Sequence, residues 1–194
     1  NWSAGSVPTV DDDVFVGGLP AGASITFRSG TTSVATLTSD AGILVTGGTL
    51  TVVGEAAFRG GLRLSAGAVN ANGGGILVGS LDVAGGTFSS GGALDVQTLA
   101  LSTGTLTGEG AVTVAAASSW SGGAITGSGT LTFVGDLSIT GAGEKVLSGG
   151  RVINTFGTTT WSGATTTNTN DFYTGPATIN NAGLWIDANA ASTI

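Results

Sequence analysis

Apolar residues recur in this chain at a nearly fixed interval, and this spacing constrains the fold more than any other feature of the sequence. The recurring unit is a short apolar–polar–apolar triplet, such as Leu62-Arg63-Leu64 or Leu81-Asp82-Val83. In a strand, alternation with period two places both apolar residues of a triplet on one face. Glycine interrupts almost every stretch, and few windows have helical spacing, so helix is disfavoured. Self-similarity with a period of roughly 19 residues predicts a solenoid.

Four apolar registers run in phase along most of the chain. Within one repeat the expected strands lie near 62–64, 69–71 and 76–78, and the next repeat begins at 81. Three strands per repeat predict an all-β, right-handed parallel β-helix with three sides and about nine rungs, which at about 4.8 Å per rung makes a rod of roughly 43 Å. The registers are Phe27, Val45, Leu64, Val83, Leu101, Trp120, Ile139, Trp161, Ile179; Ile25, Ile43, Leu62, Leu81, Leu99, Ser118, Leu137, Thr159, Ala177; Leu50, Val69, Phe88, Leu106, Ile125, Val146; and Phe58, Ile76, Leu94, Val112, Leu131, Val152.

Two local features test this assignment. Trp120 and Trp161 fall on inward positions, and the paired inward residues, Ser118 and Thr159, are small enough to compensate for the two indole rings. The longer step between Ile139 and Trp161 predicts a loop at residues 141–145 that bulges from the rod.

The repeat predicts one domain over residues 1–194. Residues 1–20 are expected to form an N-terminal cap or first rung, and residues 21–194 the remaining rungs, with the chain ending in the middle of a rung. The sequence has neither an initiator Met nor a signal peptide, so we expect a fragment of a larger protein.

The charge pattern excludes several classes of partner. Only 9% of residues are charged, the net charge is −7, and the five basic residues are scattered. No basic patch could neutralise a run of phosphates, so nucleic acid and anionic membrane surfaces are not expected partners. No apolar stretch reaches the 18 or more residues of a membrane-spanning helix. The absence of Cys excludes disulfides and thiolate metal sites, and we expect no cofactor.

Three segments resemble known bacterial repeats. Residues 170–184 are similar to the autotransporter-associated β-strand repeat, with Tyr-Thr-Gly, Thr-Ile-Asn and Gly-Leu positions. Residues 120–133 are similar to repeats of very large adhesin-like proteins, and residues 2–13 resemble the start of such repeat regions. The chain thus resembles the filamentous-haemagglutinin and autotransporter-passenger class. This resemblance implies an extracellular or cell-surface stalk, adhesin or carrier without catalytic residues, whose partners are surface glycans, proteins or neighbouring domains of the same protein.

Parallel β-helices also include polysaccharide lyases and pectinases, which need acidic clusters and a base. Here Arg63 and Asp82 lie one repeat apart and are expected to form an exposed ion pair between adjacent rungs, while Asp95 belongs to another face. The chain has no His. A degenerate polysaccharide-binding or polysaccharide-active protein therefore stays only as an alternative, and we expect no enzyme.

Three consecutive carboxylates, Asp11, Asp12 and Asp13, offer hard oxygen ligands for calcium. Their spacing matches no calcium loop. A capping turn with solvated charges is the favoured interpretation, because the first rung of a solenoid exposes unpaired strand edges.

The third register is flanked by outward polar pairs that form a Thr-rich face. Regularly spaced Thr-x-Thr pairs are typical of ice-binding β-solenoids, which gives the second functional alternative, although Thr is also a good exposed strand residue. Trp185 is expected to point outward, where it could anchor a sugar or protein. The candidate ligand-binding residues are Thr49, Thr51, Thr87, Thr105, Thr107, Thr126 and Trp185.

Overall fold

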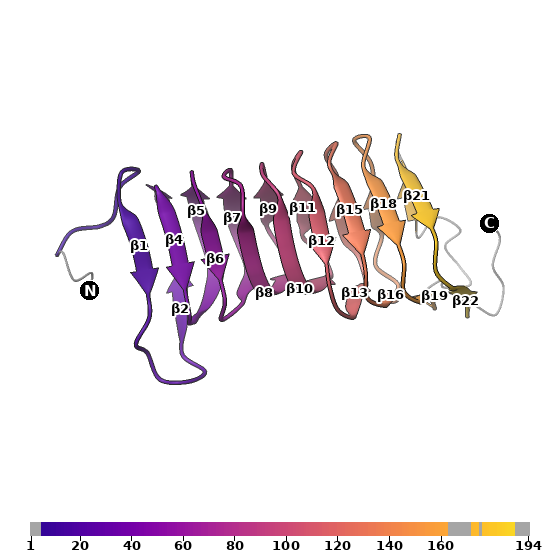
Figure 1. Cartoon of the computed structure of the whole chain (residues 1–194), viewed down its shortest axis with the longest axis horizontal. Coiled ribbons are helices and arrows are strands. Elements are labelled where there is room, and N and C mark those ends of the chain that lie inside the picture. Colours follow the sequence, from indigo (N-terminus) through magenta and orange to yellow (C-terminus); the bar gives the residue numbers. More distant parts are fainter. Residues whose placement is uncertain (1–4, 163–171, 175, 189–194) are drawn as a thin grey trace.

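The computed structural model describes residues 5–162, 172–174 and 176–188. These residues form parallel strands and no helix, wound into a β-solenoid of about eight turns with a spacing of about 19 residues (Figure 1). The predicted architecture is confirmed, with about eight turns in place of the nine expected. In Figure 1 the strands at the front run downward and the chain returns upward behind them while it advances from the N-terminal end, so the coil is right-handed.

The strands form three faces, which we call A, B and C. Face A contains β2 (Ser24–Phe27), the first part of β5 (Gly42–Val52), the first part of β7 (Leu62–Ala71), the second parts of β8 (Ile76–Val83) and β10 (Leu94–Leu101), β13 (Ser118–Trp120), β16 (Leu137–Ile139), β19 (Thr159–Trp161) and β22 (Trp185–Asp187). Face B contains β3 (Thr31–Val34), the second parts of β5 and β7, β9 (Thr87–Ser90), β11 (Thr105–Thr107), β14 (Gly123–Ile125), β17 (Lys145–Leu147) and β20 (Phe172–Thr174). Face C contains β1 (Asp13–Val16), β4 (Thr36–Ser39), β6 (Ala56–Phe58), the first parts of β8 and β10, β12 (Val112–Val114), β15 (Thr130–Phe133), β18 (Val152–Thr155) and β21 (Thr178–Asn181).

The first predicted register is confirmed from Phe27 to Trp161, because each residue pairs with the next along face A. The predicted pairing of Trp161 with Ile179 is wrong. Trp161 pairs with Asp187 and Ile153 with Ile179, so the last turn is longer than the turns before it. This turn includes residues 163–171, which lie outside the described residues.

The predicted registers also slip beside two buried basic residues. Leu147, and not Val146, continues the inward row of face B, and Ile153, and not Val152, continues that of face C. The reason is that Lys145, in β17, and Arg151, just before β18, point inward with no exposed surface, so the inward positions of these two strands are shifted by one residue.

At the other end of the fourth register the expected pairing of Phe58 with Ile76 is also wrong. Phe58 pairs with Val78 on face C.

The core is a continuous stack of inward residues from all three faces. Trp120 is 1% exposed, and its small neighbour Ser118 is buried, which confirms the expected volume compensation. The Ser118 hydroxyl accepts a hydrogen bond from the backbone N–H of Leu99 at 3.1 Å and donates one to the carbonyl of Ala116 at 3.1 Å. A polar side chain is therefore tolerated in the core because its hydrogen bonds are formed.

The expected bulge is present between β16 and β17, where residues 141–144 are exposed. Its predicted end is wrong, because Lys145 is the first residue of β17 and is buried.

Stacked glycines form the corner between faces A and B. Gly48 and Gly67 have φ of +75° and +79°, a region that favours glycine. A Cβ added to Gly67 would lie 2.5 Å from the Gly48 carbonyl oxygen, so these corners also need the closest possible backbone approach.

Candidate functional site

Face B carries an outward row of hydroxyl side chains, and it brings the predicted Thr residues together. Thr49 pairs with Ala68, Ala68 with Thr87, and Thr87 with Thr105, so these residues form one column along the rod. Thr51 lies in the second column, which continues through Asn70, Ser89, Thr107 and Thr126. Their common location on one face is confirmed.

The structure extends this face by one turn that the sequence interpretation missed. Thr31 pairs with Thr49, and Ser33 pairs with Thr51. The signal was present in the sequence, since Thr31 precedes Thr49 by one repeat.

From β3 to β14 these two columns contain only Thr, Ser, Asn and Ala. Most of these side chains are half-buried between their neighbours, and Asn70 Nδ2 donates a hydrogen bond of 3.4 Å to Thr51 Oγ1. Face B therefore presents an uncharged, regularly spaced array of hydroxyl groups that neighbouring turns hold in place.

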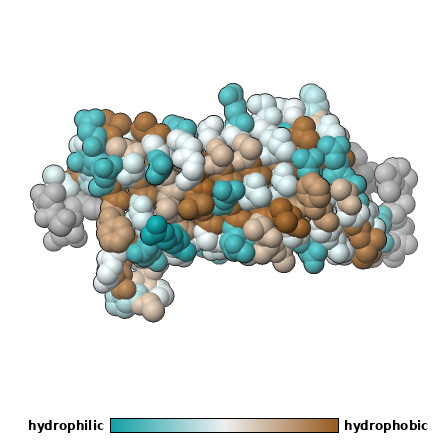
Figure 2. Space-filling model, in the orientation of Figure 1, coloured by the Kyte–Doolittle hydropathy of each residue, from teal (hydrophilic) through white to brown (hydrophobic). Residues whose placement is uncertain are grey.

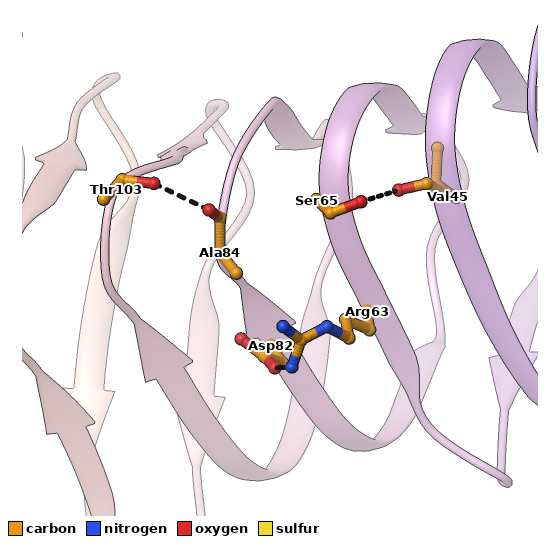
Figure 3. A network of polar contacts seen from close by, with 6 residues as sticks. All are labelled: Val45, Arg63, Ser65, Asp82, Ala84 and Thr103. Carbon is orange, nitrogen blue, oxygen red and sulfur yellow. Dashed lines mark hydrogen bonds and ion pairs between the residues drawn. The ribbon is translucent and has the colours of Figure 1, made fainter.

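Arg63 and Asp82 form the ion pair expected between adjacent turns of face A (Figure 3). Their side chains are 58% and 32% exposed, so water screens the interaction. Asp95 lies on face C beside Leu77 and Thr113, away from this pair. Arg63 and Asp82 therefore form an exposed ion pair, and the carboxylate of Asp95 lies on a different face of the solenoid.

Figure 3 also shows how hydroxyl side chains are used at the corners of the coil. Thr103 Oγ1 donates to the carbonyl oxygen of Ala84 at 2.6 Å, and Ser65 Oγ donates to that of Val45 at 3.3 Å. Each bond links a corner to the turn before it. These hydroxyl groups therefore stabilise the stack.

The acidic triplet near the N-terminus is held by hydrogen bonds to Thr residues. Asp12 Oδ2 accepts a bond of 2.7 Å from the backbone N–H of Thr9 and one of 2.9 Å from its hydroxyl. These two bonds lower the pKa of the Asp12 carboxyl. Asp13 Oδ1 accepts a 2.7 Å bond from the Thr36 hydroxyl of the next turn. Asp12 thus closes the turn before β1, and Asp13, the first residue of β1, links this strand to the next turn.

Asp11 is exposed. Within residues 5–162, 172–174 and 176–188, no three His, Cys, Asp or Glu side chains gather as potential metal ligands.

Trp185 does not point outward as predicted. It lies beside Thr159 on face A, is half-buried, and packs against the core. Its ring meets that of Trp161 edge to face, with 6.3 Å between the centroids. The prediction failed because the last turn is longer than the others, which changes the alternation in β22.

Shallow depressions lie on the surface of faces A and C. One, of about 430 Å³, surrounds Leu77 on face C and is bordered by Arg59, Asp95 and Gln97. Another, of about 380 Å³, lies over Ala100 on face A. In Figure 2, which shows the side with face C, apolar and hydrophilic residues are interspersed along the rod. Such a surface offers contacts to an extended partner more readily than it encloses a small molecule.

Comparisons with protein-family models, with curated proteins and with solved structures give no match for this chain. The described residues contain no helix with the length and hydropathy of a membrane span.

Proposed function

We propose that the chain is a rigid, non-catalytic segment of a secreted or cell-surface bacterial protein, acting as a stalk or adhesin-like passenger of the filamentous-haemagglutinin or autotransporter type. The main support for this proposal is the continuous parallel strand pairing on all three faces, in which successive turns are joined by backbone hydrogen bonds. The resemblance of residues 120–133 and 170–184 to adhesin and autotransporter repeats supports the location outside the cell.

The expected partners are glycans or proteins of an opposing surface, or neighbouring domains of the same protein. The depression around Leu77 supports a weak glycan contact, because a guanidinium, a carboxylate and an amide border an aliphatic floor. Such planar polar groups pair with sugar hydroxyls in a directional way.

Two measurements test this proposal. Small-angle scattering should give an elongated particle whose length matches about eight turns at about 4.8 Å each, and a flexible or globular particle would contradict the stalk. A glycan array should then show binding that Asp95→Ala and Gln97→Ala weaken. The control is Ser138→Ala, on the exposed surface of face A. If no glycan or protein partner binds, the adhesive part of the proposal is wrong and the stalk remains.

Face B favours a second candidate function, binding to ice. The specific observation is its uncharged pair of Thr-rich columns, which repeat at about 4.8 Å along the rod and at about 6.6 Å across a strand. A regular array of hydroxyl and methyl groups can order water in a lattice that merges with ice.

Thermal hysteresis and inhibition of ice recrystallisation test this candidate directly. Thr105→Lys should abolish both effects, since a lysine side chain interrupts the array, while Ser138→Lys on face A should leave them unchanged. Absence of activity in the unmodified protein, or equal loss in both variants, would rule out face B as an ice-binding surface.

A further inference from the structure

Arg151 lies inside the solenoid, at the corner between β17 and β18, and its side chain has no exposed surface. The pairing of Val152 with Thr130 and with Thr178 places Arg151 between Gly129 and Ala177 of the adjacent turns. It therefore occupies an inward position that its neighbours fill with small residues.

The hydrogen bonds of the guanidinium are incomplete. Nε donates to the carbonyl oxygen of Thr126 at 3.0 Å. Nη1 and Nη2 are both buried and have no hydrogen-bond partner. Burial lowers the pKa of Arg151, but a guanidinium remains charged at neutral pH. The structure thus holds a buried positive charge with two unused donor groups.

No carboxylate in the described part of the chain compensates this charge. The Arg residues that form ion pairs there are Arg59 and Arg63, both on the surface. The buried polar side chains include no acid; they are Ser39, Ser90, Ser118, Lys145, Arg151, Thr155 and Thr159.

Lys145 provides an internal comparison. Its side chain is equally buried, but Nζ donates to the carbonyl oxygens of Gly141 at 3.0 Å and Gly143 at 2.9 Å. The bulge at residues 141–144 thus supplies acceptors for the lysine, whereas the corner around Arg151 supplies one. A buried charge without partners is strongly unfavourable, and a guanidinium cannot escape the cost by losing its proton.

The backbone next to the guanidinium is kept free of side chains. A Cβ added to Gly129 would lie 2.8 Å from Nη1 of Arg151. On the other side, the neighbour Ala177 has only a methyl group.

We propose that Arg151 binds a small monovalent anion of halide size inside this corner, through Nη1 and Nη2, as a structural counter-ion. Two parallel N–H donors on a fixed plane suit one anion well. Enclosure of the site excludes phosphate, sulfate and carboxylate ligands of larger molecules.

The test is the thermal unfolding midpoint of the protein in sodium chloride or bromide, compared with sodium gluconate at equal ionic strength. Gluconate is too large to enter the corner. The midpoint of the unmodified protein should rise with halide concentration, as expected for a ligand that binds the folded state, and Arg151→Met should remove the halide dependence. Lys145→Met is the matched control, since it removes a buried cation that has its own acceptors, and it should keep the dependence.

A crystal grown in bromide gives a second measurement that does not depend on a variant folding. Anomalous scattering should place bromide beside Nη1 and Nη2 of Arg151. The proposal is overturned if no such peak appears, if halide and gluconate give equal midpoints, or if Arg151→Met keeps the full halide dependence.

Discussion

Trp185 packs edge to face against Trp161, with an interplanar angle of 73° and 6.3 Å between the ring centroids. The two rings lie on adjacent turns of face A near the end of the described solenoid, and both are partly buried against the core. This contact fixes the inward side of β22.

Loss of the Trp185 ring should therefore destabilise the last turn. Trp185→Ala is expected to lower the free energy of unfolding by about 2–3 kcal/mol, somewhat less than for a fully buried Trp, because the ring is only half-buried. Ile186→Ala, at a neighbouring residue that is 40% exposed, should cost under about 0.5 kcal/mol. Urea denaturation measures both, and equal losses would mean that the ring does not pack inward.

The buried Lys145 side chain should stabilise mainly through its aliphatic stem. Lys145→Ala is expected to cost about 2–4 kcal/mol, because it leaves a cavity in face B and frees the carbonyl groups of the bulge. Lys145→Met should cost less than half as much, since it fills the same space and the exposed bulge can be hydrated. If chemical denaturation finds the two variants equally unstable, the charge and not the stem provides the stability.

The sequence predicts most of the fold because its apolar rows are long and regular. In the register that runs from Phe27 to Trp161, each inward residue is hydrophobic and lies one repeat from the next, so alternation alone identifies the face. The same rule fails at Lys145 and Arg151, because charged residues are expected at the surface and only the three-dimensional packing shows two of them inside. It fails again at Trp185, because the long last turn breaks the spacing.

The candidate site was predictable for a similar reason. The outward Thr residues of face B follow from the inward row between them, whereas the hydrogen bonds that occupy Asp12 and Asp13 depend on the path of the first turn.

Substitution of an inward residue of a strand should change the free energy of unfolding much more than substitution of an outward residue of the same strand. Leu106 is fully buried, so Leu106→Ala is expected to cost about 2–5 kcal/mol. Thr105→Lys should change stability by less than about 0.5 kcal/mol, because the new side chain extends into water from face B. Thermal denaturation of the two variants decides this, and a large loss in Thr105→Lys would contradict the register of β11.

The ion pair between Arg63 and Asp82 should add little stability. A double-mutant cycle with Arg63→Ala and Asp82→Ala is expected to give a coupling of at most about 1 kcal/mol, because the Arg63 side chain is 58% exposed. The coupling should fall in 1 M salt. A larger coupling that resists salt would indicate a desolvated pair.

The turn closed by Asp12 should depend on pH. Its carboxyl has a lowered pKa in the folded protein, so the turn is stabilised at pH values above the ordinary Asp pKa of about 3.9 and loses this stabilisation as the pH falls through the lowered value. An NMR titration should show the Asp12 carboxyl and the Thr9 amide shifting together below that ordinary pKa. Thr9→Val should move the Asp12 pKa upward, since the Oγ1 donor is lost. An unchanged pKa in that variant would show that the hydroxyl contributes nothing.

The pairing of each turn with its two neighbours also determines how the chain responds to tension. Hydrogen bonds between turns run along the rod, so a pull on its two ends loads them directly, and the outermost turn can detach while the others stay intact. A turn of about 19 residues occupies about 4.8 Å of the folded rod and roughly 65 Å when drawn straight. Under load, such a segment lengthens stepwise by more than tenfold per turn, and it dissipates mechanical energy before any covalent bond is strained.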